Sequence, residues 1–258
     1  MQKETSMSTF DVVTQRLLED AGITEGMRVL DIGCGMGIVT RRIAQLVGST
    51  GTVVGIDSDA ASLDLARAQT TESGLQNIRY VQADLQIYQP DRDSFDAIVG
   101  RRVLMYVRNP FAVLQRLCSG LRTGGICAFQ EQTQSLISDR LGQWPLHDQL
   151  MTWIWETVRK EGADPKLGVM LPRLLTRLGF VVTVSAAATV VGLEQGQHPL
   201  HSIVEWMIPR MRKQQVITEG QIDVRTLPQQ LQAERDQNPG IYASDLTISV
   251  LARQVSAA

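Results

Sequence analysis

The sequence lacks the features that mark a secreted or membrane protein. It has only three cysteines in 258 residues, at irregular spacing, which excludes a disulfide framework and favours a reducing compartment. The first ten residues, MQKETSMSTF, contain no apolar stretch typical of a secretory signal. No apolar run approaches the roughly 20 residues that a transmembrane helix needs. We therefore expect a cytoplasmic globular protein with no membrane partner.

The sequence also lacks a strong charge of either sign. It carries 25 Lys and Arg residues against 27 Asp and Glu residues, a formal net charge of −2. Proteins that bind duplex DNA or transfer RNA are usually basic, because they neutralise phosphates, so no nucleic-acid partner is expected. Apolar residues make up 43% of the chain, which is enough for one large core in a single domain.

The first half of the sequence alternates between strand and helix patterns. The predicted helices are 8–22, 38–47, 60–70 and 110–121, and the predicted strands are 28–32, 52–56, 78–82, 97–100 and 125–132. Strands that alternate with helices are joined by right-handed crossovers, and they form a mostly parallel sheet with helices on both faces. The first half therefore predicts an α/β fold.

The second half has a different composition. All four tryptophans and all three histidines lie between residues 144 and 206. The predicted elements here are helices at 171–178, 201–213 and 226–237, and strands at 181–186 and 246–252. The sequence thus predicts two late strands separated by helical segments.

A glycine-rich turn follows the first predicted strand. Residues 29–37 read Val-Leu-Asp-Ile-Gly-Cys-Gly-Met-Gly, with three glycines at alternate positions. Glycine permits a sharp turn and a close approach of the backbone to a ligand. Asp57 ends the second strand, where a carboxylate can accept both hydroxyls of a ribose. Asp84 ends the third strand, where it can accept a hydrogen bond from an adenine amino group.

The spacing of these glycines differs from that of a dinucleotide site. The fingerprint G-x-G-x-x-G would place its third glycine at position 38, which is Ile38. Asp31 precedes the first glycine, and a carboxylate there would repel a pyrophosphate, whereas it can accept a hydrogen bond from the ammonium of an amino acid. The pattern therefore favours a ligand with ribose and adenine but no phosphate.

These residues resemble the successive motifs of the class I S-adenosylmethionine-dependent methyltransferases. The resemblance continues through residues 95–99 (Phe-Asp-Ala-Ile-Val), 100–110 and 121–125 (Leu-Arg-Thr-Gly-Gly), and it covers about residues 25–132. It points to the small-molecule branch, near the ubiquinone/menaquinone-type and natural-product enzymes. The resemblance implies a Rossmann-like, doubly wound, seven-stranded sheet of order 3-2-1-4-5-7-6, with strand 7 antiparallel.

The resemblance also implies how the chain is organised. Residues 1–258 would form a single methyltransferase domain, with residues 1–132 as its cofactor-binding half. Residues 133–170 and 195–240 would form a helical cap that binds the substrate over the active site. The sequence leaves open whether the protein is a monomer or a homodimer.

The implied cofactor is S-adenosylmethionine, with S-adenosylhomocysteine as its product. Ten residues at matching positions are expected to bind it, namely Asp31, Gly33, Cys34, Gly35, Asp57, Ser58, Ala83, Asp84, Leu85 and Arg101. Other interpretations exist for some of them. Asp57 could cap the following helix, although Asp59 fits that role better, and Asp84 could be a surface turn residue.

The implied reaction transfers a methyl group to an O, N or C atom of a small-molecule acceptor by in-line displacement. A neutral acceptor also needs a base within reach of its proton. The candidates are His147, Tyr106 and Glu131, and the sequence does not choose among them. His198 and His201 are spaced like a pair of metal ligands. No Cys, Asp or second His cluster flanks them, so no metal site is expected.

Two alternative functions remain open on the sequence alone. A protein of this kind could bind S-adenosylmethionine and catalyse another reaction, such as a cyclisation, or it could act as a sensor. The fourth strand is followed by Gly-Arg-Arg at 100–102 rather than by Asn/Asp-Pro-Pro-Tyr/Phe. This difference argues against methylation of the exocyclic amines of nucleobases or of glutamine side chains.

Overall fold

A computed structural model describes residues 9–134, 143–191, 199–238, 240 and 242–254 of the chain. The strands are β1 (Arg28–Ile32), β2 (Thr52–Asp57), β3 (Ile78–Gln82), β4 (Phe95–Arg101), β5 (Leu121–Thr133), β6 (Phe180–Val191) and β7 (Tyr242–Gln254). They form one sheet of order β3-β2-β1-β4-β5-β7-β6. β1 to β5 are parallel, and β7 is antiparallel to both of its neighbours. The predicted strand order and the antiparallel seventh strand are confirmed.

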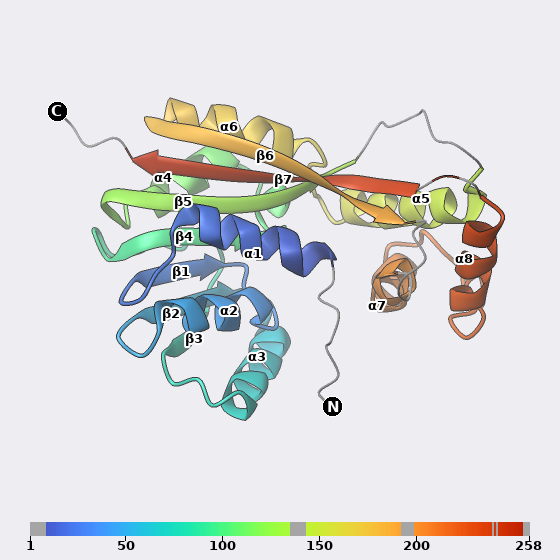
Figure 1. Ribbon diagram of the computed structural model, residues 1–258, viewed down its shortest axis with the longest axis horizontal. Helices are drawn as coiled ribbons and strands as arrows, with labels where there is room; N and C mark the ends of the chain where they lie inside the picture. Colours follow the sequence, from blue (N-terminus) through green and yellow to red (C-terminus); the bar gives the residue numbers. More distant parts are fainter. Residues whose placement is uncertain (1–8, 135–142, 192–198, 239, 241, 255–258) are drawn as a thin grey trace.

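Helices cover both faces of this sheet, as Figure 1 shows. The helices are α1 (Thr9–Ala21), α2 (Ile38–Val47), α3 (Ala60–Glu72), α4 (Pro110–Cys118), α5 (Pro145–Lys160), α6 (Leu167–Arg177), α7 (Pro199–Lys213) and α8 (Leu227–Asp236), with a short 3₁₀ turn at Leu104–Tyr106. α1, α2 and α3 lie over one face, and α4 and α6 lie over the other. Apolar side chains recur at helical spacing on α2, where Val39, Ile43 and Val47 are buried against the sheet.

Some of the predicted boundaries are wrong by several residues. The fourth helix ends at Cys118 instead of 121, because the chain turns at Gly120 and Leu121 already pairs with Phe95 in the sheet. The two late strands are longer than predicted. Their antiparallel pairing runs from Phe180 opposite Gln254 to Val191 opposite Tyr242, and this backbone pairing includes residues that show no apolar alternation.

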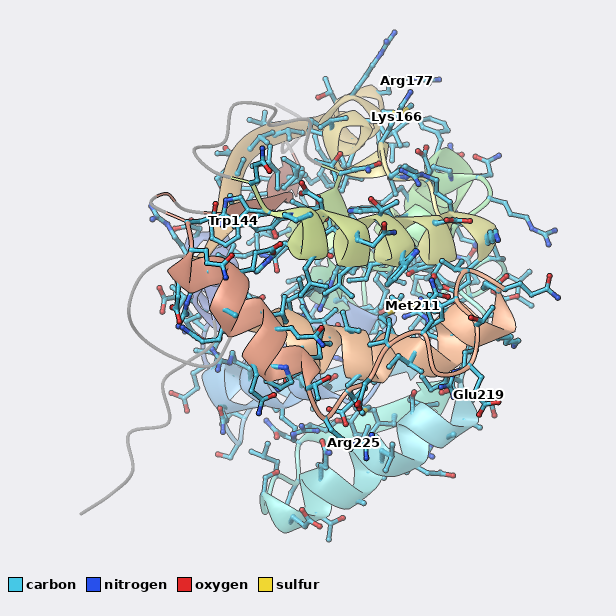
Figure 2. All side chains as sticks on the ribbon, turned by 90° about the vertical axis from the view of Figure 1, so that its right-hand side faces the viewer. Trp144, Lys166, Arg177, Met211, Glu219 and Arg225 are labelled. Carbon is cyan, nitrogen blue, oxygen red and sulfur yellow. The ribbon has the colours of Figure 1, made fainter. Side chains whose placement is uncertain are left out.

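The remaining helices form a layer at the carboxyl ends of the parallel strands. We call α5, α7 and α8 the helical layer; its own small core contains Leu150, Leu200, Val204, Leu227 and Leu231. Figure 2 views the layer face-on, with α8 crossing near Trp144 at the start of α5. The layer falls within the predicted cap, but residues 167–170 belong to α6, which packs on β5, β6 and β7. Within the described residues, no helix is both long enough and apolar enough to cross a membrane.

Candidate functional site

The glycine-rich turn after β1 is crowded on one side and open on the other. A Cβ added at Gly33, whose φ is +61°, would lie 2.3 Å from Cγ2 of Val103 in the loop after β4. Gly35 has a φ of +51°, yet no atom lies within 4 Å of the position that its Cβ would take. Glycine adopts such positive φ angles without the strain that a side chain brings. The turn is therefore packed against the protein at Gly33 and leaves room for a ligand at Gly35.

Asp57, at the end of β2, holds this turn in place. Its Oδ2 accepts the N–H of Gly35 at 2.8 Å, and its Oδ1 accepts the N–H of Asp59 at 2.9 Å. Asp59 is the helix cap, since its Oδ2 accepts the N–H of Ser62 at 3.0 Å at the start of α3. Each carboxylate oxygen can accept a second hydrogen bond, so Asp57 can hold the turn and still bind the hydroxyls of a ligand.

Two adjoining cavities meet beside the turn. The small cavity, of about 380 Å³, lies next to the ends of β2 and β3. The large cavity, of about 590 Å³, lies between the ends of β1 and β4 and the helical layer. Gly33, Arg102 and Tyr106 border both of them. Both volumes fall within the usual range for small-molecule sites.

All ten predicted cofactor-binding residues border one of these cavities. The small cavity is bordered by Gly33, Asp57, Ser58, Ala83, Asp84 and Leu85, and the large one by Asp31, Gly33, Cys34, Gly35 and Arg101. They come from the carboxyl ends of four different strands, which is where open α/β sheets bind their ligands. The sheet topology, rather than closeness along the chain, brings these residues together.

Asp31 and Arg101 place opposite charges at one end of the large cavity. The Asp31 side chain is buried, and its Oδ2 accepts the hydroxyl of Thr40 at 2.5 Å. Burial raises the pKa of Asp31 to about 7, against the opposing effects of the Thr40 hydrogen bond and of Arg101. Arg101 donates to the hydroxyl of Thr14 on α1 at 3.4 Å. A carboxylate beside a guanidinium suits the ammonium and carboxylate of an amino acid.

Two of the three candidate catalytic residues lie near the loop after β4. Tyr106 borders both cavities, and its hydroxyl accepts a hydrogen bond from Arg210 on α7 at 3.2 Å. Glu131 borders neither cavity. It is fully buried, and its Oε1 accepts the N–H groups of Val103 at 3.1 Å and of Leu104 at 2.7 Å. Its neighbour Gln132 borders the large cavity instead.

The third candidate, His147, lies in the helical layer and also borders neither cavity. Its ring is buried between Trp144 and Tyr242, at centroid distances of 5.0 and 4.9 Å. Its Nδ1 is paired with Oε2 of Glu234 on α8, and its backbone N–H donates to the same oxygen. His198 of the predicted His198–His201 spacing lies outside the described residues. Among those described, no three His, Cys, Asp or Glu side chains are grouped to hold a metal.

The burial of Glu131 leads to a prediction on pH. Burial raises its pKa from 4.5 to about 7 in the folded protein, against the opposing effect of the loop N–H groups. The folded chain therefore keeps a proton that the unfolded chain releases, so the free energy of unfolding falls as the pH rises from about 4.5 to 7. At about 1.4 kcal/mol per pH unit, this contribution is about 3 kcal/mol.

Glu131→Gln is expected to lose less stability between pH 5 and pH 8 than the wild type, by about 2–3 kcal/mol. Urea unfolding at the two pH values measures the difference. Asp31 has a similarly raised pKa and remains in both proteins, so the pH dependence is reduced rather than abolished. Glu72→Gln, at an exposed position on α3, is the control. If the free energy of unfolding of Glu131→Gln depended on pH as strongly as that of the wild type, the prediction would be contradicted.

The walls of the large cavity include residues of the predicted cap segments and one residue that the sequence analysis missed. The helical layer contributes an apolar wall that includes Met151, Ile154, Val158, Leu200, Ile203 and Met207. Asp245, near the start of β7, borders the same cavity, and its Oδ2 accepts the indole N–H of Trp155. No motif surrounds Asp245 in the sequence, so only the structure identifies it.

Comparison with known proteins identifies the family. A family model described as a methyltransferase domain matches residues 23–166, more than half of the chain. The chain belongs to this family. The predicted resemblance to the class I S-adenosylmethionine-dependent methyltransferases is thereby confirmed.

Curated relatives of this methyltransferase include two named after small molecules. Aklanonic acid methyltransferase DauC of Streptomyces sp. (strain C5) is 35% identical over 120 residues, which are 46% of this chain and 54% of that protein. Demethylmenaquinone methyltransferase of Staphylococcus aureus (strain MRSA252) is 30% identical over 129 residues, 50% of this chain and 53% of that protein. The similarity spans about half the length of these relatives.

Solved structures that share this fold include proteins named after different reactions. The [4+2]-cyclase SpnF is 17% identical to this methyltransferase, with a TM-score of 0.60 over 99% of this chain and 86% of that chain. Phosphoethanolamine N-methyltransferase 2 of Haemonchus contortus, solved in complex with S-adenosyl-L-methionine, is 15% identical, with a TM-score of 0.60 over 95% of this chain and 53% of that chain. At these identities the likeness shows the fold alone.

Proposed function

We propose that this methyltransferase transfers the methyl group of S-adenosylmethionine to an O, N or C atom of a largely apolar small molecule held in the large cavity. The proposal rests chiefly on the two adjoining cavities. One is bordered by the carboxylates at the ends of β2 and β3, and the other extends from the glycine-rich turn to the apolar wall of the helical layer. The names of the two curated relatives, which denote small molecules, support an acceptor of this class.

The residues around the turn fit the donor molecule. Asp57 would accept the ribose hydroxyls, and Asp84 the adenine amino group, from the wall of the small cavity. Asp31 and Arg101 would bind the ammonium and the carboxylate of the methionine part, and the open side of Gly35 leaves room for the backbone of the ligand. When bound, the cofactor would supply a methyl group activated by the sulfonium, and the neutral thioether of S-adenosylhomocysteine would be the leaving group.

The chain's own contribution is mainly to hold the acceptor in line and to exclude water. Well-aligned intramolecular reactions gain on the order of 7–11 kcal/mol from positioning alone. Tyr106 is well placed to orient the acceptor, because it stands where the two cavities meet and Arg210 fixes its hydroxyl. Glu131 and His147 border neither cavity, and we assign them structural roles. Glu131 would hold the loop after β4 through that loop's N–H groups, and His147 would join α5 to α8 within the helical layer.

The proposal is tested by following a labelled methyl group. The purified protein is incubated with methyl-labelled S-adenosylmethionine and a metabolite extract, and label is expected to appear in an extractable small molecule. Calorimetry with S-adenosylhomocysteine is run alongside. Cofactor binding without any transfer would favour the alternatives of a different reaction or a sensor. Absence of cofactor binding would reject the assignment of the site itself.

Asp57→Ala is expected to weaken the binding of S-adenosylhomocysteine by about 1–3 kcal/mol, because hydrogen bonds to a carboxylate are lost. Isothermal calorimetry measures the change. Asp59→Ala is the matched control, since it removes a neighbouring carboxylate that caps α3 and borders neither cavity. The control is expected to lower stability through the lost helix cap and to leave the affinity unchanged. Equal affinities for both variants would argue against the ribose assignment.

A further inference from the structure

One buried acidic residue that borders the large cavity, Asp245, is not among the residues assigned to the cofactor. Asp245 is only 8% exposed, and its carboxylate borders the cavity beside the apolar wall of the helical layer. The indole N–H of Trp155 donates to its Oδ2, which fixes the orientation of the carboxylate. The carboxylate therefore places a hydrogen-bond acceptor in a largely apolar part of the cavity wall, where it can contact a bound acceptor molecule.

A bulge in β7 brings Asp245 to the cavity. In the pairing of β6 with β7, Ala188 lies opposite Leu246 and Val190 lies opposite Ala243. The two β6 residues are two positions apart, whereas their β7 partners are three positions apart, so β7 holds one extra residue in this interval. On a regular strand, positions 242 and 245 would face opposite sides of the sheet. Both Tyr242 and Asp245 nevertheless border the large cavity. Bulges are known to redirect side chains in this way next to functional sites.

The sheet register shows how far Asp245 lies from the cofactor end of the cavity. Gln130 on β5 pairs with Arg101 at the end of β4 and also with Ser249 on β7. Asp245 precedes Ser249 by four residues, which is roughly 10–13 Å along the strand at about 3.3 Å per residue. Asp245 therefore lies well beyond the level at which β1 and β4 end, where it contacts Trp155 of the helical layer, and it borders the same cavity as the glycine-rich turn.

We propose that Asp245 is a specificity residue that binds a hydroxyl group at the far end of an elongated, largely apolar acceptor. The inference rests on the proposed function of the large cavity. A carboxylate accepts a hydrogen bond from a hydroxyl and repels a carboxylate on the ligand. An ammonium is disfavoured by the cavity as a whole, because its three arginines (Arg101, Arg102 and Arg210) outnumber its two aspartates and the donor adds a sulfonium.

Three biphenyl probes of one shape test the proposal in the presence of saturating S-adenosylhomocysteine. Para-phenylphenol carries a hydroxyl donor, para-methoxybiphenyl carries none, and para-(aminomethyl)biphenyl carries an ammonium. Calorimetry on the wild-type protein is expected to show that the phenol binds about tenfold more tightly than the other two, the usual effect of a hydrogen bond to a charged group. This comparison needs no variant, so it does not depend on how a substitution folds.

Asp245→Asn then tests the residue itself, because the amide keeps the shape and an oxygen acceptor for Trp155. The variant is expected to lose the preference for the phenol and to keep its affinity for S-adenosylhomocysteine within twofold. Asp236→Asn, at an exposed position on α8, makes the same change of charge outside the cavity and is expected to behave as the wild type.

The outcomes separate this inference from the proposed function. If S-adenosylhomocysteine itself does not bind, the proposed function fails. If it binds, but the phenol does not bind, shows no preference, or keeps its preference in Asp245→Asn, only the role of Asp245 is overturned. Tighter binding of the amine would likewise overturn it, since the site would then select a cation.

Discussion

Gly35→Val is expected to reduce the affinity for S-adenosylhomocysteine by a hundredfold or more. The position that a Cβ would take at Gly35 is empty space on the wall of the large cavity, and we assign that space to the ligand. A branched side chain there would occupy it. The variant should still fold, since no protein atom lies within 4 Å of the added carbon.

The control for this substitution is Gly74→Val. Gly74 has a φ of +72° and also has no atom within 4 Å of its added Cβ, but it borders neither cavity. Both variants carry the strain of a left-handed backbone, at least about 1–2 kcal/mol, so unfolding experiments should show similar losses of stability. Only Gly35→Val should lose binding in calorimetry. Normal binding by Gly35→Val would mean that no ligand lies over the turn.

His147→Ala is expected to lower the free energy of unfolding by about 3–5 kcal/mol. The substitution removes a buried ring packed against Trp144 and Tyr242, and it takes away the side-chain partner of the Glu234 carboxylate, which then keeps, within the described part of the chain, only backbone N–H donors in α5. Loss of one member of a buried pair leaves the other without its compensating contact, and the missing ring leaves a cavity. Urea unfolding measures the change. This pair links the start of α5 to α8, so the effect should be on the helical layer.

His201→Ala is the matched control for this substitution. His201 lies on α7 of the same layer, is only partly buried, and its Nε2 is 3.1 Å from the hydroxyl of Ser202. The loss of the His201 ring is expected to change the free energy of unfolding by no more than about 0.5 kcal/mol.

The affinity of His147→Ala for S-adenosylhomocysteine is measured at temperatures where this variant remains folded. It should stay within twofold of the wild-type value, because His147 borders neither cavity. If His147→Ala lowered the free energy of unfolding by less than about 1 kcal/mol, the pair of His147 with Glu234 would contribute little to stability.

The cofactor side of the molecule was predictable because its signals are local. The glycine turn directly follows the buried strand β1, Asp57 is the last residue of β2, and Asp84 lies just after the edge strand β3. Parallel strands bring their carboxyl ends to one edge of the sheet. What the sequence did not show is that Asp57 also ties down the turn through the N–H of Gly35. That bond joins residues 22 positions apart, and it depends on the register of β1 against β2.

The acceptor side was less predictable because its contacts are distant in sequence. His147 was a reasonable candidate base from its type alone, but its partner Glu234 is 87 residues away, and the pairing buries the ring in the helical layer. Glu131 was placed correctly on the fifth strand, yet its side chain points to the loop after β4 rather than into a cavity. Asp245 depends on a bulge, and no periodicity in the sequence marks a bulge.

The division of the chain between the two cavities has a practical consequence for engineering. The cofactor end is built from residues up to 107, whereas the apolar wall and the far end come mostly from α5, α7 and the start of β7. The helices α5, α7 and α8 of the helical layer could therefore be exchanged between relatives, while the central sheet and the donor half of the protein stay the same. Chimeras of this kind would change which compounds are modified without rebuilding the machinery that carries the methyl group.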